Sequence, residues 1–226
     1  MRGECFTYII TMNTEKITHY DVYEEYRTKK NISLDLVPYY SKILNEKTQR
    51  FDFDNPQVDP YKLKDKLIAT MFQHGGIGIA ANQVGINLSV FVLRPDLACF
   101  NPKIIEYSEE TVLSNEGCLS YPLLYLPIKR SRAVLVSFYD ENGKEIHDAF
   151  EGLTARCFQH EYDHINGVNY QMRCDTYHRN RATKKWKKFM KDEKRAKEII
   201  ANKGTEILVS EKRNFDSDKE IFTYSA

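Results

Sequence analysis

Hydrophobic positions recur at helical spacing in two stretches of the chain. The residues of the first stretch follow Asp59, a favoured N-cap, begin with Pro60, a favoured first helical residue, and end at Gly75-Gly76. Their apolar positions are Leu63, Leu67, Ile68, Met71 and Phe72. Residues 153–165 place Leu153, Cys157, His160 and His164 along one face. We therefore predict two helices and expect the second to lie at the centre of the fold.

Strand patterns surround these two helices. Residues 88–93 form an apolar run that ends at Arg94-Pro95, as expected of a buried strand. Residues 133–140 and 145–150 flank Asn142-Gly143, the strongest short signal for a β-hairpin. Residues 101–107 and 111–113 also read as strands. Together the elements predict an α+β fold, with antiparallel or mixed β-sheets packed around the helix over residues 153–165.

The two ends of the chain differ from this middle part. Residues 1–35 are polar and rich in tyrosine, compatible with a short helix over residues 20–29, and Met12 is an alternative start. Residues 179–197 carry ten Lys and Arg against two acidic residues, a net charge of +8, which leaves −7 for the rest of a chain of net charge +1. Trp186, Phe189 and Met190 give this segment a narrow apolar edge. It reads as a solvated amphipathic helix docked by that edge, or as a contact for RNA phosphates. Residues 206–210 are a further candidate strand.

Composition excludes several classes of protein. A length of 226 residues with 42% hydrophobic residues suits one domain with extensions. A net charge of +1 implies no general attraction to DNA or to a membrane surface, and no apolar run approaches the length of a membrane span. The five cysteines are odd in number and lack a Cys-x-x-Cys pair, so we expect no disulfide framework and a reducing, cytoplasmic compartment.

The segment Gln159-His160-Glu161-Tyr-Asp-His164 carries the clearest chemical signal. A His-Glu-x-x-His sequence on a helix places both imidazoles on one face, about 5–6 Å apart at Cβ. Both can then reach one metal ion, with Glu161 beside any water bound there. The alternative is a surface helix with two solvated histidines.

A tetrahedral metal site needs a third protein ligand, and Cys118 in Glu116-Gly117-Cys118-Leu-Ser is the candidate. Thiolate binds zinc and ferrous iron strongly, although a free cysteine is also a common buried apolar residue. The segment over residues 76–83, Gly-Ile-Gly-Ile-Ala-Ala-Asn-Gln, is too apolar for a solvated loop and too rich in glycine for a stable helix. It lacks the lysine and spacing of a phosphate-binding loop. Its simplest interpretation is a tight connection packed against the core.

In their order along the chain, the three segments resemble the motifs of the peptide deformylase family. That family carries Gly-x-Gly-Φ-Ala-Ala-x-Gln, then Glu-Gly-Cys-Leu-Ser, then Gln-His-Glu-x-Asp-His, and this chain matches all three. The resemblance runs from about Val37 to Met172. It implies an N-terminal extension over residues 1–35, a deformylase-like catalytic domain over residues 36–178, and a basic C-terminal helix and tail over residues 179–226.

The resemblance also implies a reaction. A metal-dependent hydrolase of this kind removes the N-formyl group from formyl-methionine at the start of newly made polypeptides. Cys118, His160 and His164 would bind Fe²⁺ or Zn²⁺, for which Ni²⁺ or Co²⁺ can substitute. The ion would lower the pKa of bound water, and Glu161 would pass the water proton to the departing amine. The Gln83 amide and the Leu119 backbone N–H match the donors to the oxyanion.

Further residues are implied around the substrate. The formyl-methionyl peptide would lie extended beside Gly76, Gly78 and Gly117, paired as an added strand. The expected contacts of its methionine are Ile77, Leu153, the stem of Arg156 and Cys157, although each also suits plain core packing. Tyr125 would line the outer rim. Glu116 and Arg130 match a family pair that braces the second motif.

Three departures from the family pattern and two rival functions remain. The link from Asp96 to Asn101 is short. After Pro122 many relatives have glycine where this chain has Leu123, and residues 168–171 are more polar than the usual Leu-Phe-x-Asp. One rival is a His-Glu-x-x-His protease with a third ligand other than Cys118. The other is an inactive binding module. Bacterial deformylases place a C-terminal helix on the ribosome, so the resemblance favours ribosomal RNA as a partner of residues 179–197, although the segment does not match that helix residue by residue.

Overall fold

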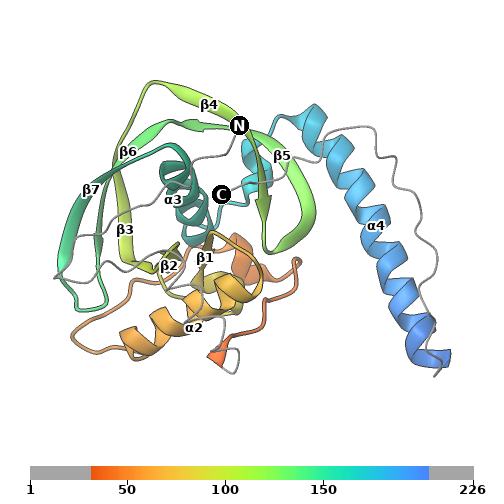
Figure 1. Ribbon diagram of the computed structural model, residues 1–226, viewed down its shortest axis with the longest axis horizontal. Helices are drawn as coiled ribbons and strands as arrows, with labels where there is room; N and C mark the ends of the chain where they lie inside the picture. The colour runs from red at the N-terminus through yellow and green to blue at the C-terminus, as the bar shows by residue number, and fades with distance from the viewer. Residues whose placement is uncertain (1–31, 204–226) are drawn as a thin grey trace, which may run out of the picture.

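A five-stranded sheet and a two-stranded sheet enclose a central helix in this computed structural model, which describes residues 32–203 (Figure 1). The larger sheet has the order β1-β2-β3-β6-β7 and the smaller one pairs β4 with β5. All of these pairings are antiparallel. The strands are β1 (Gly78–Ala80), β2 (Val90–Leu93), β3 (Leu97–Tyr107), β4 (Thr111–Cys118), β5 (Tyr121–Ser131), β6 (Ala133–Tyr139) and β7 (Glu145–Glu151). The α+β prediction is confirmed.

Helix α2 (Pro60–Gln73) forms where the sequence predicts it. Asp59 Oδ1 accepts hydrogen bonds from the backbone N–H groups of Tyr61 and Lys62, at 3.0 and 3.1 Å, which satisfies two of the free donors at the helix start. Its apolar face is buried against β1 and β2 together with Phe51. This packing fixes the lower layer beneath the sheet (Figure 1).

Helix α3 (Gly152–Ile165) is the central element. It contacts strands of both sheets, β1, β2, β6 and β7 on one side and β5 on the other. Phe158 packs edge-on against Phe91 with ring centroids 4.9 Å apart, and both rings are fully buried. His160 and His164 are also buried, whereas Leu153 at the helix start is 57% exposed. The predicted face therefore holds, except at its first residue.

The sequence pattern misses strand β5 and also β1, whose residues were interpreted as a tight connection, and β4 runs further than predicted, to Cys118. Proline is disfavoured in strands because it cannot donate to the ladder, and β5 contains Pro122 and Pro127. A two-stranded sheet leaves β4 with a free edge, and β1 is likewise the edge strand of the larger sheet. Three short 3₁₀ helices complete the described part of the chain: η2 (Lys42–Asn45), η3 (Ala81–Val84) and η4 (Tyr170–Arg173).

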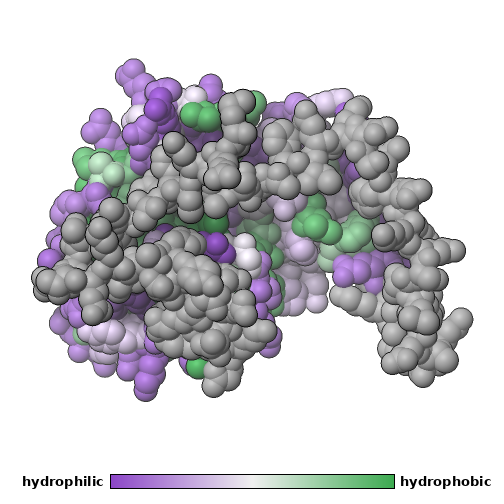
Figure 2. Space-filling model, in the orientation of Figure 1, coloured by the Kyte–Doolittle hydropathy of each residue, from purple (hydrophilic) through white to green (hydrophobic). Residues whose placement is uncertain are grey.

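Helix α4 (Thr176–Lys203) begins before the predicted basic segment and ends after it. Its first half packs on β5 through Trp186, which is 5% exposed, and through Met190, whereas Phe189 is 39% exposed. Hydrophobic residues meet where β5 faces α4 (Figure 2), and the second half of the helix points away from the body (Figure 1). Within residues 32–203 no helix is long and apolar enough to cross a membrane. The helix predicted over residues 20–29 and the strand over 206–210 lie outside the described residues.

Candidate metal centre and active site

Three possible metal-donor atoms converge between β4 and α3. Cys118 is the last residue of β4, and His160 and His164 lie one turn apart on α3. One ligand atom from each residue lies within 4.8 Å of the other two. Cys118 Sγ is 3.2 Å from His164 Nε2, and both imidazoles are buried. A thiolate and two imidazoles form a donor set that suits zinc or ferrous iron.

The surroundings of the histidines also fit a metal ion. His160 Nδ1 lies 3.1 Å from Glu116 Oε2, so the carboxylate orients the ring and leaves Nε2 facing the other donors. Carboxylates hold metal-bound histidines in this way in many proteins. Asn82 Nδ2 donates to the His164 carbonyl at 2.6 Å and fixes the end of the helix. The residues present therefore fit one divalent ion with protein ligands Cys118, His160 and His164.

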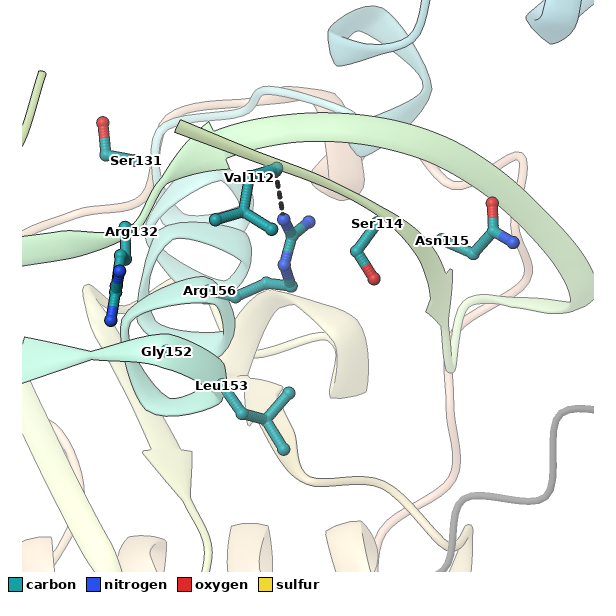
Figure 3. Close-up of a pocket in the computed structure, with 8 residues that line it drawn as sticks. All are labelled: Val112, Ser114, Asn115, Ser131, Arg132, Gly152, Leu153 and Arg156. Atoms are coloured by element: carbon teal, nitrogen blue, oxygen red, sulfur yellow. Dashed lines mark hydrogen bonds between the residues drawn. The ribbon is translucent and has the colours of Figure 1, made fainter. Parts of the chain in front are cut away.

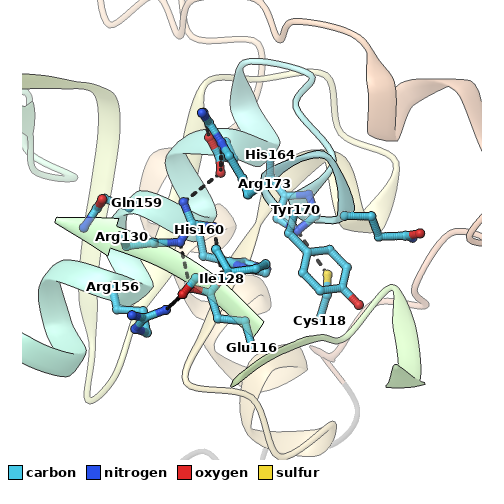
Figure 4. A network of polar contacts seen from close by, with 12 residues as sticks. Glu116, Cys118, Ile128, Arg130, Arg156, Gln159, His160, His164, Tyr170 and Arg173 are labelled. Atoms are coloured by element: carbon cyan, nitrogen blue, oxygen red, sulfur yellow. Dashed lines mark hydrogen bonds and ion pairs between the residues drawn. The ribbon is translucent and has the colours of Figure 1, made fainter. Parts of the chain in front are cut away.

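A buried ionic network anchors this arrangement from behind (Figure 4). Arg130 Nε and Nη2 donate to the two carboxylate oxygens of Glu116 at 2.7 and 2.9 Å, and Nη1 donates to Asp163 at 2.8 Å. Arg173 from η4 binds Asp163 as well, at 2.6 and 3.1 Å. Burial raises the pKa of Glu116, but the hydrogen bonds from His160 and Arg130 outweigh it and lower the pKa to about 2. Glu116 is therefore ionised beside His160.

Glu161 follows His160 on α3, and its carboxylate lies against Gly78 of β1. Its side chain is buried, and its Oε2 has no hydrogen-bond partner among residues 32–203. Burial raises the pKa of Glu161 to about 7, although His160 and Arg130 oppose the shift. A Cβ at Gly78 would lie 2.7 Å from Glu161 Oε1 and from Cys157 Sγ. The backbone of β1 therefore passes directly over the carboxylate, which only glycine permits.

Gln83 comes from η3 and faces the turn that follows Cys118. Its Oε1 accepts from the Ala80 N–H at 2.9 Å, which orients the amide. Its Nε2 donates to Ser120 Oγ at 3.0 Å and lies 3.5 Å from Cys118 Sγ. A Cβ at Gly76 would be 2.8 Å from Leu119 Cδ1, so this glycine is also packed tightly against the turn.

A pocket of about 270 Å³ opens beside β4 and the start of α3 (Figure 3). Leu153 and Arg156 project into it from α3, and Val112, Ser114 and Asn115 line it from β4. The other two residues expected to contact the substrate methionine are placed differently. Ile77 is 43% exposed, and Cys157 is buried beneath Gly78. Neither is among the residues lining this pocket.

Arg156 does more than line the pocket with its stem. Its Nη1 donates to Glu116 and, at 3.1 Å, to the Ile128 carbonyl, while Nη2 donates to the Val112 carbonyl. The guanidinium thus ties α3 to both strands of the small sheet. At the opposite end of β4, the Tyr125 ring covers Gly117, where a Cβ would lie 2.8 Å from Tyr125 Cε1. Arg156 and Tyr125 therefore pack against the two ends of β4.

Comparison with known proteins identifies this arrangement. Residues 33–180 match the model of the polypeptide deformylase family. The chain belongs to that family. A peptide deformylase of Borreliella burgdorferi is 37% identical over 164 residues, which cover 70% of this chain and 96% of the relative. The peptide deformylase of Thermotoga petrophila is 41% identical over 110 residues, 47% of this chain and 67% of that protein. A crystal structure of the Synechococcus elongatus deformylase with actinonin superposes with a TM-score of 0.63 at 35% identity, covering 67% of this chain and 86% of that one.

Membership of the deformylase family establishes the activity of the chain. The chain is a metal-dependent hydrolase that removes the formyl group from newly made polypeptides. Within this family frame, the structure also gives contacts to residues that stand inside the motifs but had no assigned role: Asn82, Ser120, Gln159 and Asp163. Gln159, for example, exchanges two hydrogen bonds with the Ser131 backbone, at 2.8 and 3.2 Å. Tyr170, whose ring lies 5.5 Å from that of His160, stands in the segment 168–171 that departs from the family pattern and had no assigned role.

Proposed function

We propose that Cys118, His160 and His164 hold the divalent ion of this deformylase and that Glu161 is its general base. One observation carries the proposal: three ligand atoms within 4.8 Å of one another stand beside a buried carboxylate with a free oxygen. The metal dependence belongs to the family, and the assignment of these four residues is ours.

Each group has one task in the hydrolysis. A divalent ion held by these ligands supplies the Lewis acidity that makes water nucleophilic near neutral pH. Glu161 accepts a proton from the attacking water and delivers it to the amine nitrogen as the C–N bond of the formamide breaks. Gln83 Nε2–H and the Leu119 N–H donate to the oxyanion that forms on the formyl oxygen. The products are formate and a peptide with a free amino terminus.

Two free strand edges supply a place for the peptide. β1, which begins at Gly78, is an edge strand of the large sheet, and β4, which contains Gly117, is an edge strand of the small sheet. An extended peptide between them would add its own backbone hydrogen bonds to both edges. Its first side chain would enter the pocket of Leu153 and Arg156, with Ile77 and Cys157 towards β1 and Tyr125 at the outer rim. Gly76 lies beside this edge, packed against the Leu119 side chain.

The test is release of formate from a short formyl-Met peptide by protein purified without oxygen, with metal content measured on the same sample. Formate release that follows the bound metal supports the assignment. Metal-loaded protein without formate release would contradict it and would leave the binding-module alternative. Iron and zinc both suit the ligand set, so the metal content of natively produced protein also decides which ion the chain uses.

Cys118→Ser separates a deformylase centre from a His-Glu-x-x-His protease centre. We expect the variant to lose most of its bound metal, because a serine hydroxyl is a much poorer ligand than thiolate for zinc or ferrous iron. Metal per protein is the measurement. Cys99→Ser is the control, because Cys99 is buried in the core of the large sheet and is not one of the three ligands. Full metal retention in Cys118→Ser would point to another third ligand.

We also propose that α4 contacts ribosomal RNA through its exposed lysines and that the enzyme acts in the cytoplasm or in the translation compartment of an organelle. In this proposal the catalytic domain, residues 36–178, lies between the extension 1–35 and the basic helix and tail 179–226. The support is a charge of +8 over residues 179–197 on a helix whose second half projects from the body. Lys184, Lys187, Lys188 and Lys191 are all exposed.

Replacing these four lysines by glutamine tests the RNA contact without disturbing Trp186, which a deletion of the helix would remove from the core. We expect weaker ribosome pelleting, and a slope of log affinity against log salt that is smaller by about 3, because fewer counterions are released. The control carries the same charge change on the body, at the exposed residues Lys62, Lys66, Lys103 and Lys144. Equal losses in both variants would contradict a specific role of α4.

A further inference from the structure

Leu123 adopts a backbone conformation that leucine rarely takes. Its φ is +62°, in the left-handed region where the Cβ of any residue other than glycine is crowded. Its side chain is 66% exposed, so burial of the leucine does not compensate for this strain. The residue lies near the start of β5, five positions after Cys118. A strained residue persists only when its surroundings hold it in place.

Two hydrogen bonds hold the carbonyl groups of the residues before and after Leu123. The Trp186 indole N–H donates to the Pro122 carbonyl at 2.7 Å, and the Tyr170 hydroxyl donates to the Leu124 carbonyl at 2.8 Å. Both donors are fixed by packing, since Trp186 is 5% exposed and Tyr170 only 1%. We call these two hydrogen bonds the Leu123 clamp. One half of the clamp comes from α4 and the other from η4.

Aromatic packing joins the two halves. Tyr121 lies between them, with ring centroids 5.8 Å from those of both Trp186 and Tyr170. Tyr39 packs edge-on against Trp186 at 4.9 Å, and the Tyr121 hydroxyl donates to the Tyr39 carbonyl at 3.2 Å. The clamp is therefore part of a rigid cluster, and a change at one donor cannot be absorbed by free movement of the ring.

The clamp acts close to the reacting groups. Tyr121 is paired with Cys118 across the turn formed by Leu119 and Ser120. The same turn contains the Leu119 N–H, and Ser120 Oγ accepts a hydrogen bond from Gln83 Nε2 at 3.0 Å. The start of β5 therefore sets the position of both proposed oxyanion donors.

We propose that Trp186 and Tyr170 are positioning residues for deformylation, which hold Leu123 in its left-handed conformation and thereby fix the turn over residues 118–120. This rests on the proposed function for the role of the turn. It makes the first half of α4 part of the catalytic unit, in addition to any partner bound by its basic side chains.

Trp186→Phe tests the first half of the clamp, since it keeps an aromatic ring and removes the N–H donor. We expect kcat for a formyl-Met peptide to fall about fivefold, the value of one ordinary hydrogen bond. KM and metal content should stay unchanged, because the donors of the turn act on the oxyanion of the transition state. Tyr170→Phe should behave in the same way. Phe189→Leu removes an aromatic ring from a more exposed position of the same helix and should leave kcat unchanged.

Leu123→Gly is the decisive background, because glycine takes a φ of +62° without strain. In this background we expect Trp186→Phe to lower kcat less than twofold. An equal fall in both backgrounds, or no fall in either, would overturn the proposal.

A second experiment unfolds the same four proteins, namely the wild type, the two single variants and the double variant, in urea. The effects of the two substitutions on the free energy of unfolding should again be coupled. Metal-loaded wild-type protein that releases no formate would refute the proposed function, and coupling in urea would then still support the clamp. Absence of coupling in urea would overturn it.

Discussion

Glu161→Gln should abolish most of the activity while leaving the metal in place. Glutamine has nearly the shape of glutamate but cannot take up the water proton at neutral pH. General acid–base catalysis contributes about 10²–10⁴-fold to such reactions, so kcat should fall by that factor. The three proposed ligands, Cys118, His160 and His164, are untouched. Formate release at saturating peptide and metal per protein, measured on the same preparation, check both parts of the expectation.

Among residues 32–203, the two other carboxylates closest to the proposed ligands are already held by arginines. Asp163 is the nearest acidic residue along α3, but Arg130 and Arg173 occupy both of its oxygens. Glu116 is likewise held by Arg130, Arg156 and His160. Glu145→Gln, at the exposed end of β7, is the matched control and should keep full activity. A Glu161→Gln enzyme with more than a tenth of wild-type kcat would require a different base.

Arg130→Met should be the most destabilising change in the site. Arg130 is 6% exposed and binds Glu116 and Asp163 at 2.7 to 2.9 Å. Removing one member of a buried ionic group typically costs about 3–5 kcal/mol, because a charge stays behind in a poorly solvated place. Arg156 and Arg173 still neutralise part of that charge, so we expect about 3 kcal/mol in urea unfolding, the lower end of that range. Metal affinity should fall about 10–100-fold, since Glu116 orients His160.

Arg132→Met provides a control with the same chemistry in a different environment. Arg132 also binds two carboxylates, those of Glu110 and Glu151, at 3.1 and 2.8 Å. Its side chain is 49% exposed and those of its partners are 63% and 65% exposed. Exposed ion pairs contribute about 0–1 kcal/mol, so this variant should unfold almost like the wild type. Similar losses for Arg130→Met and Arg132→Met would mean that burial is not the cause.

Local sequence patterns account well for the elements whose side chains repeat regularly. The spacing of His160 and His164 on a helix determines that both rings point the same way, and the apolar face of α2 determines its buried side. Likewise the narrow apolar edge of residues 179–197 contains Trp186 and Met190, which do pack on β5. In these cases the helical repeat alone is sufficient to predict which side chains share a face.

Contacts between distant segments could not be predicted in the same way. Arg156 reads as a residue with an apolar stem, yet its guanidinium binds Glu116 and the Val112 carbonyl, which depends on how α3 meets the small sheet. Strand β5 is hidden by Pro122 and Pro127, which are tolerated because the strand pairs on one side only, with β4. The sequence marks Leu123 only as a position where many relatives have glycine, and the hydrogen bonds from Trp186 and Tyr170 beside it become visible only in the structure.

The projecting half of α4 has a consequence for reach. Helix α4 has 28 residues, about 42 Å at 1.5 Å per residue, and Trp186 anchors it at its eleventh position. About 25 Å of helix therefore extends past the anchor. A surface gripped by that end would hold the catalytic centre at a set distance from the place where a growing chain emerges. An extended chain covers about 3.3–3.6 Å per residue. On the proposed ribosome contact, the helix would act as a spacer, and some seven or eight extended residues of a nascent chain would match its length past Trp186.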